Sequence, residues 1–320
     1  MKTTLLLIFC LLQFAAVAQE TQELPISVQA TSEIVRILSS HSAEGRKTNT
    51  PGFDKAAKFA ESFMLNNGIL PLFGNSYRDT LAYSDYTGYN LIGQIGSFDI
   101  DRKTIVLGAH LDHLGIIGGK IYNGANDNAS GSTALLQIAA YLNQFEHNEN
   151  IIVALFCGEE EGKLGSYHFA RKLGLYGVVP SYMINFEMLG VPMNKKSNRN
   201  VYASGFEMSN FADQLNASAG FAFVEFFSGE YRNNIFNRSD NVAFYQIFGI
   251  PAHTLCAFTI DNYYPYHKQN DEFRQLDIPY LNRVINISAL AIGEMLKNDV
   301  EIRLHDNHEK TYQKNHVRKP

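Results

Sequence analysis

Residues 151–162 read IIVALFCGEEEG, an apolar run over 151–156 followed by three adjacent carboxylates at 159–161. A short, continuous and β-branched run predicts a strand that is buried on both faces, as in a parallel sheet. Carboxylates crowded at the end of such a strand repel one another and are costly to desolvate. A bound cation would remove that cost, so the stretch predicts a metal-dependent hydrolase.

Strands alternate with helices along the rest of the chain. Apolar runs predict strands at 89–95, 104–109, 150–156, 182–188, 201–204 and 252–258. Helix-like apolar periodicity predicts helices at 27–40, 53–67, 130–143, 164–174, 207–219, 240–248 and 276–297, with a break in the last one at Pro279. This order predicts an α/β fold with a mixed, mostly parallel central β-sheet flanked by helices on both faces. No internal repeat or low-complexity linker divides the sequence, so we expect one domain over residues 19–300.

Both ends of the chain differ from this domain. A basic Lys2, an apolar run over 5–16 and small residues at 16–18 predict a signal peptide over residues 1–18, since the run is shorter than the ~20 residues of a membrane span. The mature protein is then expected to be secreted or periplasmic, without stable membrane insertion. Residues 301–320 form a polar C-terminal tail, which we expect to be solvated and frayed.

The composition narrows the function classes. The chain has 320 residues, of which 45% are hydrophobic and 18% charged, which suits a globular protein with a substantial core. A net charge of −5 and scattered basic residues argue against nucleic-acid binding. Cys157 and Cys256 remain after signal removal and lie on apolar strand patterns, which favours buried free thiols, although an oxidising compartment would permit a disulfide.

Residue types that bind metals also follow the other predicted strands. They are His110 and Asp112 after the strand 104–109, Asp127 in the polar loop 124–131, Glu187 at the end of the strand 182–188, and His267 in an aromatic-rich loop. Each signal is weak alone. Asp127 by itself fits a turn before a helix, Glu187 a cap, and His267 a packed surface histidine.

Taken together with Glu159 and Glu160, these residues suit Zn²⁺, which accepts imidazole and carboxylate ligands. Two ions that share one carboxylate would lie roughly 3.5–4 Å apart. Successive residues that leave a strand point in different directions. One of Glu159 and Glu160 can therefore bind metal while the other contacts the metal-bound water. For the same reason we expect His113 to point away from Asp112.

At these positions the chain resembles the M28 peptidases, which are co-catalytic zinc aminopeptidases and their relatives. The resemblance rests on an ordered set of segments: Ala109–His113, Gly124–Gly131, Glu159–Ser166, Asn185–Gly190, Arg238–Asn241 and Tyr266–Asp271. It implies two zinc ions per chain. One would take His110 and Glu187, the other would take Glu160 and His267, and Asp127 would bridge them.

The resemblance also implies roles for two further side chains. Glu159 would be the general base, Asp112 would orient His110, and the peptide bond after Asp127 would be cis. Three positions depart from the family pattern: Glu187 where aspartate is usual, Lys268-Gln269 where a Thr-Pro step is usual, and Asn241 where histidine is common. The first bears on metal affinity and the other two on substrate preference.

The candidate site residues are compatible with three functions to different degrees. The resemblance favours an exported zinc-dependent exopeptidase, specifically an aminopeptidase for peptides with a free N-terminus, whose ammonium group nearby carboxylates would bind. The alternative is a single-zinc glutaminyl cyclase, which would not need both His110 and Glu187. A non-catalytic ectodomain should lack ligands or the base, and every position is filled. Aromatic residues at 226–231 and 263–264 are expected either to wall a side-chain pocket or to pack against the core, and the oligomeric state is left open.

Overall fold

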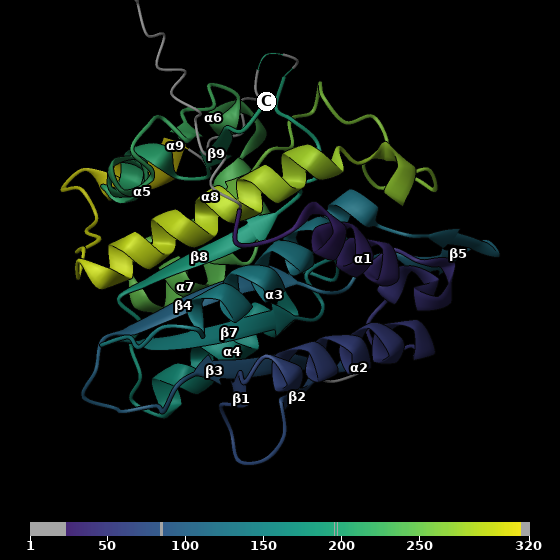
Figure 1. Ribbon diagram of the computed structural model, residues 1–320, viewed down its shortest axis with the longest axis horizontal. Coiled ribbons are helices and arrows are strands. Elements are labelled where there is room, and N and C mark those ends of the chain that lie inside the picture. Colours follow the sequence, from purple (N-terminus) through teal and green to yellow (C-terminus); the bar gives the residue numbers. More distant parts are fainter. Residues whose placement is uncertain (1–23, 84–85, 195, 197, 315–320) are drawn as a thin grey trace, which may run out of the picture.

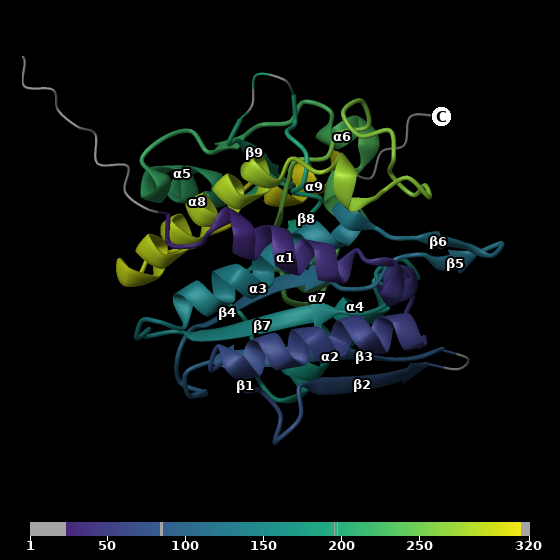
Figure 2. The ribbon, with the colours of Figure 1, turned by 45° about the vertical axis from the view of Figure 1, so that its right-hand side comes forward.

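The computed structural model describes residues 24–83, 86–194, 196 and 198–314, so the signal peptide expected at 1–18 lies outside the described residues. Within them, a nine-stranded sheet crosses the molecule and carries helices on both faces (Figures 1 and 2). None of the helices in these ranges is long and apolar enough to cross a membrane.

The strands of the main sheet are β1 (Leu70–Pro71), β2 (Arg78–Tyr83), β3 (Tyr86–Ile95), β4 (Thr104–His110), β7 (Asn150–Phe156), β8 (Tyr182–Glu187), β9 (Val201–Ala203), β10 (Val224–Glu225) and β11 (Ala252–Cys256). They lie in the order β1-β3-β7-β4-β8-β11-β9-β10, and β2 pairs with β3. The four central strands β7, β4, β8 and β11 are parallel, whereas β3 and β9 join them antiparallel. The predicted mixed α/β sheet is confirmed. The short strands β1 and β10, the edge strand β2 and the hairpin of β5 (Gly115–Ile117) and β6 (Lys120–Tyr122) were not predicted.

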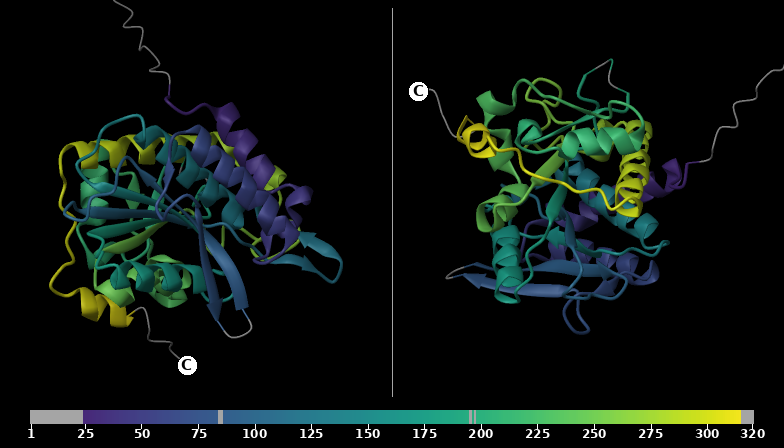
Figure 3. Two further views of the ribbon diagram at one scale, coloured as in Figure 1. Left: turned by 90° about the horizontal axis from the view of Figure 1, so that it is seen from below. Right: turned by 90° about the vertical axis from the view of Figure 1, so that its left-hand side faces the viewer.

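Helices cover the two faces of the sheet as separate layers (Figure 3). One layer contains α1 (Val28–Leu38), α2 (Pro51–Asn66), α3 (Gly131–Leu142) and α8 (Ile278–Lys297), with α5 (Phe211–Ala219) against α8, and the other contains α4 (Leu164–Leu175) and α7 (Asn241–Phe248). Neighbouring residues of β4 face opposite helix layers: Leu107 packs with the first layer and Val106 packs with the second. Short helical segments are α6 (Glu230–Asn233), α9 (His308–Lys314), the 3₁₀ turns His41–Arg46, Phe206–Met208, Ile235–Arg238 and Phe273–Gln275, and a π-type turn at Ala125–Ser130.

Two expectations about the last part of the chain are wrong. Pro279 does not break the final helix but lies in its first turn, where no backbone N–H is needed and the side chain of Asp277 caps the helix by accepting from Tyr280 N. The tail is not frayed as far as residue 314, because α9 packs its Tyr312 ring 4.7 Å from Tyr245 and 5.7 Å from Phe236. A polar composition concealed these aromatic contacts.

Candidate metal centre

The carboxyl ends of the parallel strands bring the predicted site residues to one edge of the sheet, which is where α/β proteins hold their ligands. His110 ends β4, Glu159 and Glu160 follow β7, Glu187 ends β8, His267 lies in the loop after β11, and Asp127 lies in the turn before α3. One cleft is lined by Asp127, Glu159, Glu187 and His267. The residues from distant parts of the sequence therefore converge as expected.

Asp127 lies at the centre of this group. Its Oδ1 is 3.4 Å from His110 Nε2, and its Oδ2 is 3.1 Å from His267 Nε2. The same nitrogen of His267 is 3.1 Å from Glu160 Oε2. Asp127 thus offers a different oxygen to each imidazole, which is the arrangement a bridging carboxylate requires.

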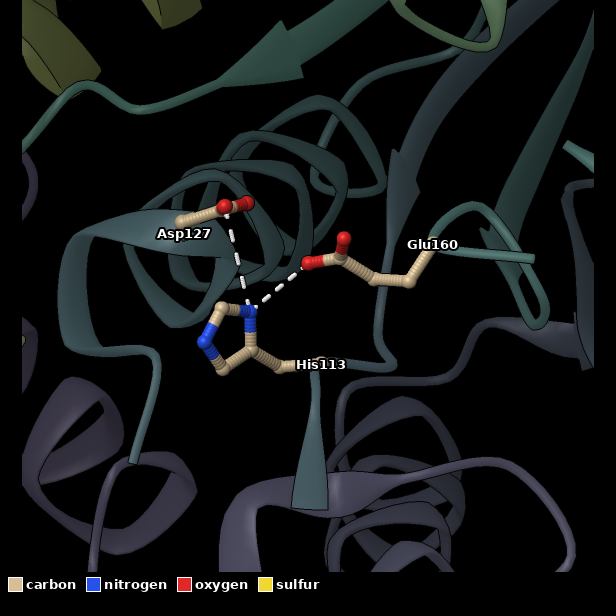
Figure 4. A group of neighbouring side chains, drawn as sticks. All are labelled: His113, Asp127 and Glu160. Atoms are coloured by element: carbon tan, nitrogen blue, oxygen red, sulfur yellow. Dashed lines mark hydrogen bonds and ion pairs between the residues drawn. The ribbon is translucent and has the colours of Figure 1, made fainter. Parts of the chain in front are cut away.

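His113 also points into the centre (Figure 4), a placement that the sequence did not predict, because the expectation concerned only its direction relative to Asp112. Its Nδ1 lies 2.8 Å from Glu160 Oε1 and 3.8 Å from Asp127 Oδ2. The alternation of side chains applies only within a strand, and β4 ends at His110. Beyond it the chain turns, and the backbone N–H of His113 donates to the carbonyl of Arg46 at 3.3 Å.

The turn that carries Asp127 is held by its neighbours. Gly124 has φ of 58°, and a Cβ there would lie 2.3 Å from the carbonyl oxygen of Asp127. The side chain of Asn128 donates to Phe186 O and accepts from the backbone N–H of Met188, which ties the turn to the end of β8. The peptide bond between Asp127 and Asn128 is cis, as the resemblance implied.

Two buried carboxylates hold the backbone of the ligand loops. Asp271 accepts from the backbone N–H of Asp127 at 3.1 Å and from that of the preceding residue at 2.8 Å. Asp112 accepts from the backbone N–H groups of Glu159 and Glu160 at 3.2 and 3.3 Å. His110 Nδ1 bonds to the backbone carbonyl of Asp112 at 3.1 Å, while the Asp112 carboxylate lies 3.9 Å from that nitrogen. Asp112 therefore orients His110 through its carbonyl and the glutamate loop through its carboxylate.

Arg46 is a positioning residue that the sequence reading missed, because residues 45–52 read only as a loop. Its guanidinium is fully buried and donates four hydrogen bonds of 2.6–2.9 Å to backbone carbonyls. The acceptors are Leu38, Leu111, Asn123 and Gly124. Two of these residues border the Asp127 turn and one lies between His110 and Asp112, so a single side chain joins both ligand segments.

Burial and hydrogen bonds to the histidines act in opposite directions on the carboxylates: burial prevails at Glu187, Asp112 and Glu159, whereas the histidines lower the pKa of Asp127 and Glu160. Burial raises the pKa of Glu187 to about 7 and that of Asp112 to about 8, and it raises the pKa of Glu159 well above its usual value. Burial opposes protonation of His267, but its hydrogen bonds to Asp127 and Glu160 outweigh that effect and raise its pKa to about 10. The site therefore favours bound positive charge. Protons on these side chains supply part of that charge, and a divalent cation would supply it fully.

The donor atoms fit metal ions. Nε2 of His110 and Oε2 of Glu187 are buried without a hydrogen-bond partner among the described residues. One nitrogen or oxygen each from His113, Asp127 and Glu160 lie within 4.8 Å of one another. Imidazole nitrogen and carboxylate oxygen are the donors that zinc takes in catalytic sites. His110, Asp127 and Glu187 would hold one ion, and Glu160 and His267 would join Asp127 on the other.

The cleft beside the donors has apolar walls, formed by Met188, Tyr202, Ile235, Cys256, Phe258 and Tyr266. The aromatic residues at 226–231 and 263–264 are absent from this lining. Phe227 instead packs on Tyr202, and the buried Tyr263 donates to Asp271 at 2.6 Å, so the packing interpretation holds for these two residues. Phe226 and Tyr264 are exposed and fit neither interpretation. Cys256 lies in the cleft as a free buried thiol, and Cys157 is also free and buried, which confirms the prediction for both.

A sheet edge that presents histidine and carboxylate donors beside a cleft is typical of α/β metallohydrolases. Residues 90–292 match the model of peptidase family M28. The chain belongs to this family.

The chain is also similar to named proteins and to solved structures. Leucine aminopeptidase 2 of Trichophyton rubrum is 32% identical over 113 residues, which are 34% of this chain and 21% of that protein. The matched segment thus spans about a fifth of that curated relative. BSAP, a zinc aminopeptidase from Bacillus subtilis, superimposes with a TM-score of 0.67 at 15% identity and covers 87% of this chain and 97% of that one. Porphyromonas gingivalis glutaminyl cyclase gives 0.63 at 18% identity, with 86% and 99% covered. At these identities the two structures confirm the fold.

Proposed function

We propose that the protein is an exported zinc-dependent aminopeptidase with two metal positions. The observation that carries the proposal is that Asp127 contacts both His110 and His267, and that Asp127, Glu187 and His267 line the same cleft as Glu159. Membership of family M28 and a relative named leucine aminopeptidase support the same activity. A non-catalytic protein would have no need to retain all of these residues together.

Glu159 is the proposed general base. Its carboxylate lies in the cleft beside Asp127, and burial raises its pKa well above the usual value. A carboxylate with a raised pKa accepts the proton of an attacking water and later donates it to the departing amine. Zinc, when bound, polarises the scissile carbonyl and lowers the pKa of water.

The cleft favours a substrate with an apolar side chain, because Met188 and Phe258 supply apolar walls. Asp127 and Glu187 are proposed metal ligands, so bound zinc would neutralise their charge. The preference for a free N-terminus is proposed from membership of family M28 and from the relative named leucine aminopeptidase.

Activity assays would test this proposal against the glutaminyl cyclase alternative. The purified protein should bind two zinc ions per chain and release the N-terminal residue from free peptides but not from N-acetylated ones. Cyclisation of N-terminal glutamine with one zinc per chain would instead support the cyclase. Turnover of acetylated peptides would exclude an aminopeptidase.

Export is proposed from the apolar segment at residues 1–18. The full-length chain should be processed near residue 18 and recovered outside the cytoplasm. N-terminal sequencing of the mature protein is the direct measurement, and an unprocessed N-terminus would contradict the proposal.

A further inference from the structure

His113 lies outside the ligand set that the resemblance implies, yet it faces the same atoms as His267. Its side chain is fully buried, and its ring centroid lies 5.8 Å from that of His267 at an interplanar angle of 65°. Both rings direct a nitrogen toward Asp127 Oδ2 and the carboxylate of Glu160 (Figure 4 shows His113).

Four donor separations among these side chains are close to those of a tetrahedral zinc site, with Glu160 facing His113 through Oε1 and His267 through Oε2. Zinc bonds of about 2.0–2.1 Å place two donors of a tetrahedron about 3.3 Å apart. Nδ1 of His113 is 2.8 Å from Glu160 and 3.8 Å from Asp127. Nε2 of His267 is 3.1 Å from each of the same two carboxylates. All four separations fall within about 0.5 Å of the tetrahedral value.

The other position has fewer protein donors. His110 and Glu187 join Asp127 there, and His110 Nε2 lies 3.4 Å from Asp127 Oδ1. Zinc sites with four protein ligands are typically structural, whereas catalytic sites keep one position open for water or substrate. The two positions therefore differ in the number of protein donors that they offer.

We propose that His113 is an additional metal ligand, and that it makes the position formed with Asp127, Glu160 and His267 a closed, tightly retained zinc site. The position of His110, Asp127 and Glu187 is the open and more easily exchanged one. This inference rests on the proposed two-metal function of the same cleft. It gives the two ions different roles: the ion at the closed position is held tightly, and the ion at the open position contacts the substrate.

A hydrogen bond from His113 to Glu160 is the competing explanation of the 2.8 Å contact. Two substitutions separate the two roles. Asparagine in His113→Asn can still donate a hydrogen bond from nearly the same place but does not replace an imidazole on zinc. Aspartate in His113→Asp offers a zinc ligand but, when ionised, donates nothing. The exposed His41 provides the control His41→Asn.

Zinc release to a competing chelator is the measurement, with bound zinc counted by mass spectrometry. Native protein should release one ion early and hold the second at chelator concentrations higher by more than about 100-fold, since even a lost outer-shell partner weakens metal sites 10–100-fold. His113→Asn should abolish that difference, while His113→Asp and His41→Asn should keep most of it. The unfolding temperature of each metal-free variant shows whether it folds.

Other outcomes overturn the inference in separable ways. Release of both ions from native protein in a single phase would refute the unequal positions, whether or not any variant folds. Retention by His113→Asn together with loss in His113→Asp would assign a hydrogen-bond role instead. Either result would leave the aminopeptidase proposal intact if native protein still binds two zinc ions and cleaves free peptides. Native protein that binds no zinc would refute both.

Discussion

Replacing the buried Arg46 should lower the free energy of unfolding strongly, because its guanidinium holds four backbone carbonyls. Arg46→Met keeps a long apolar stem but removes every donor of the guanidinium. Four buried backbone carbonyls would lose their partner. Since an unsatisfied buried polar group costs about 1–3 kcal/mol, the lower end alone predicts a loss of about 4 kcal/mol in the free energy of unfolding.

Arg46→Lys separates the charge from the geometry. Lysine keeps a positive charge but has three donors on a single nitrogen, which cannot reach carbonyls spread around a planar guanidinium. On the same basis of about 1 kcal/mol for each unsatisfied carbonyl, we expect this variant to lose about 1–2 kcal/mol from one or two lost partners. The loss should be smaller than that of Arg46→Met.

Urea denaturation of metal-free protein is the assay, because bound zinc would stabilise the folded state and mask the change. Arg102→Met is the control, since Arg102 is exposed and its contact with Asp99 is a surface ion pair of 3.7 Å. Its effect should stay within about 0.5 kcal/mol. An Arg46→Met protein within about 1 kcal/mol of the native one would refute the structural role assigned to the four hydrogen bonds.

Three further outcomes are expected. Glu159→Gln should lower kcat by about 10²–10⁴-fold while bound zinc, counted by mass spectrometry, stays unchanged, and lost zinc would make Glu159 a ligand. Asp127→Ala should lose both zinc ions, and full activity would exclude its bridging role. Burial lowers the pKa of His253 to about 4, so the unfolded chain takes up a proton before the folded one does. The free energy of unfolding, measured by urea denaturation, should therefore fall by about 3 kcal/mol between pH 6.5 and pH 4. His253→Gln should remove this part of the pH dependence. The same change of the free energy of unfolding with pH in both proteins would contradict the assignment.

The central strands and the convergence of the ligands were predictable because both follow from local rules. Buried parallel strands are continuous apolar runs, and their carboxyl ends meet at one edge of the sheet. Glu187 and His267 gave weak signals alone, and their placement followed from the family resemblance. The fold added the contacts that a sequence cannot display, such as the distances from Asp127 to both imidazoles.

The missed features depend on tertiary contacts instead. The edge strand β2 is exposed at most positions, so its apolar signal is faint. The contacts of His113 with Asp127 and Glu160 were not predicted, because the chain turns after the last residue of β4 and side-chain alternation no longer applies there. Arg46 gave no signal at all, because its four acceptors are backbone carbonyls from segments up to 78 residues away in sequence.

The way in which Arg46 is bonded explains how a buried cation can coexist with a metal site. A direct ion pair with Asp127 or Glu160 would occupy oxygens that the metal needs. The guanidinium instead donates its hydrogen bonds to backbone carbonyls. Its charge still attracts the nearby carboxylates of Asp271, Asp127, Asp112 and Glu160 without direct contact. It thereby lowers the repulsion among the carboxylates of the metal-free protein without taking a ligand atom. The same charge must weaken cation binding. Arg46→Met removes both the charge and the four hydrogen bonds, and we expect it to lose zinc affinity because the ligand loops are disturbed. A gain in zinc affinity would show that the charge outweighs the positioning.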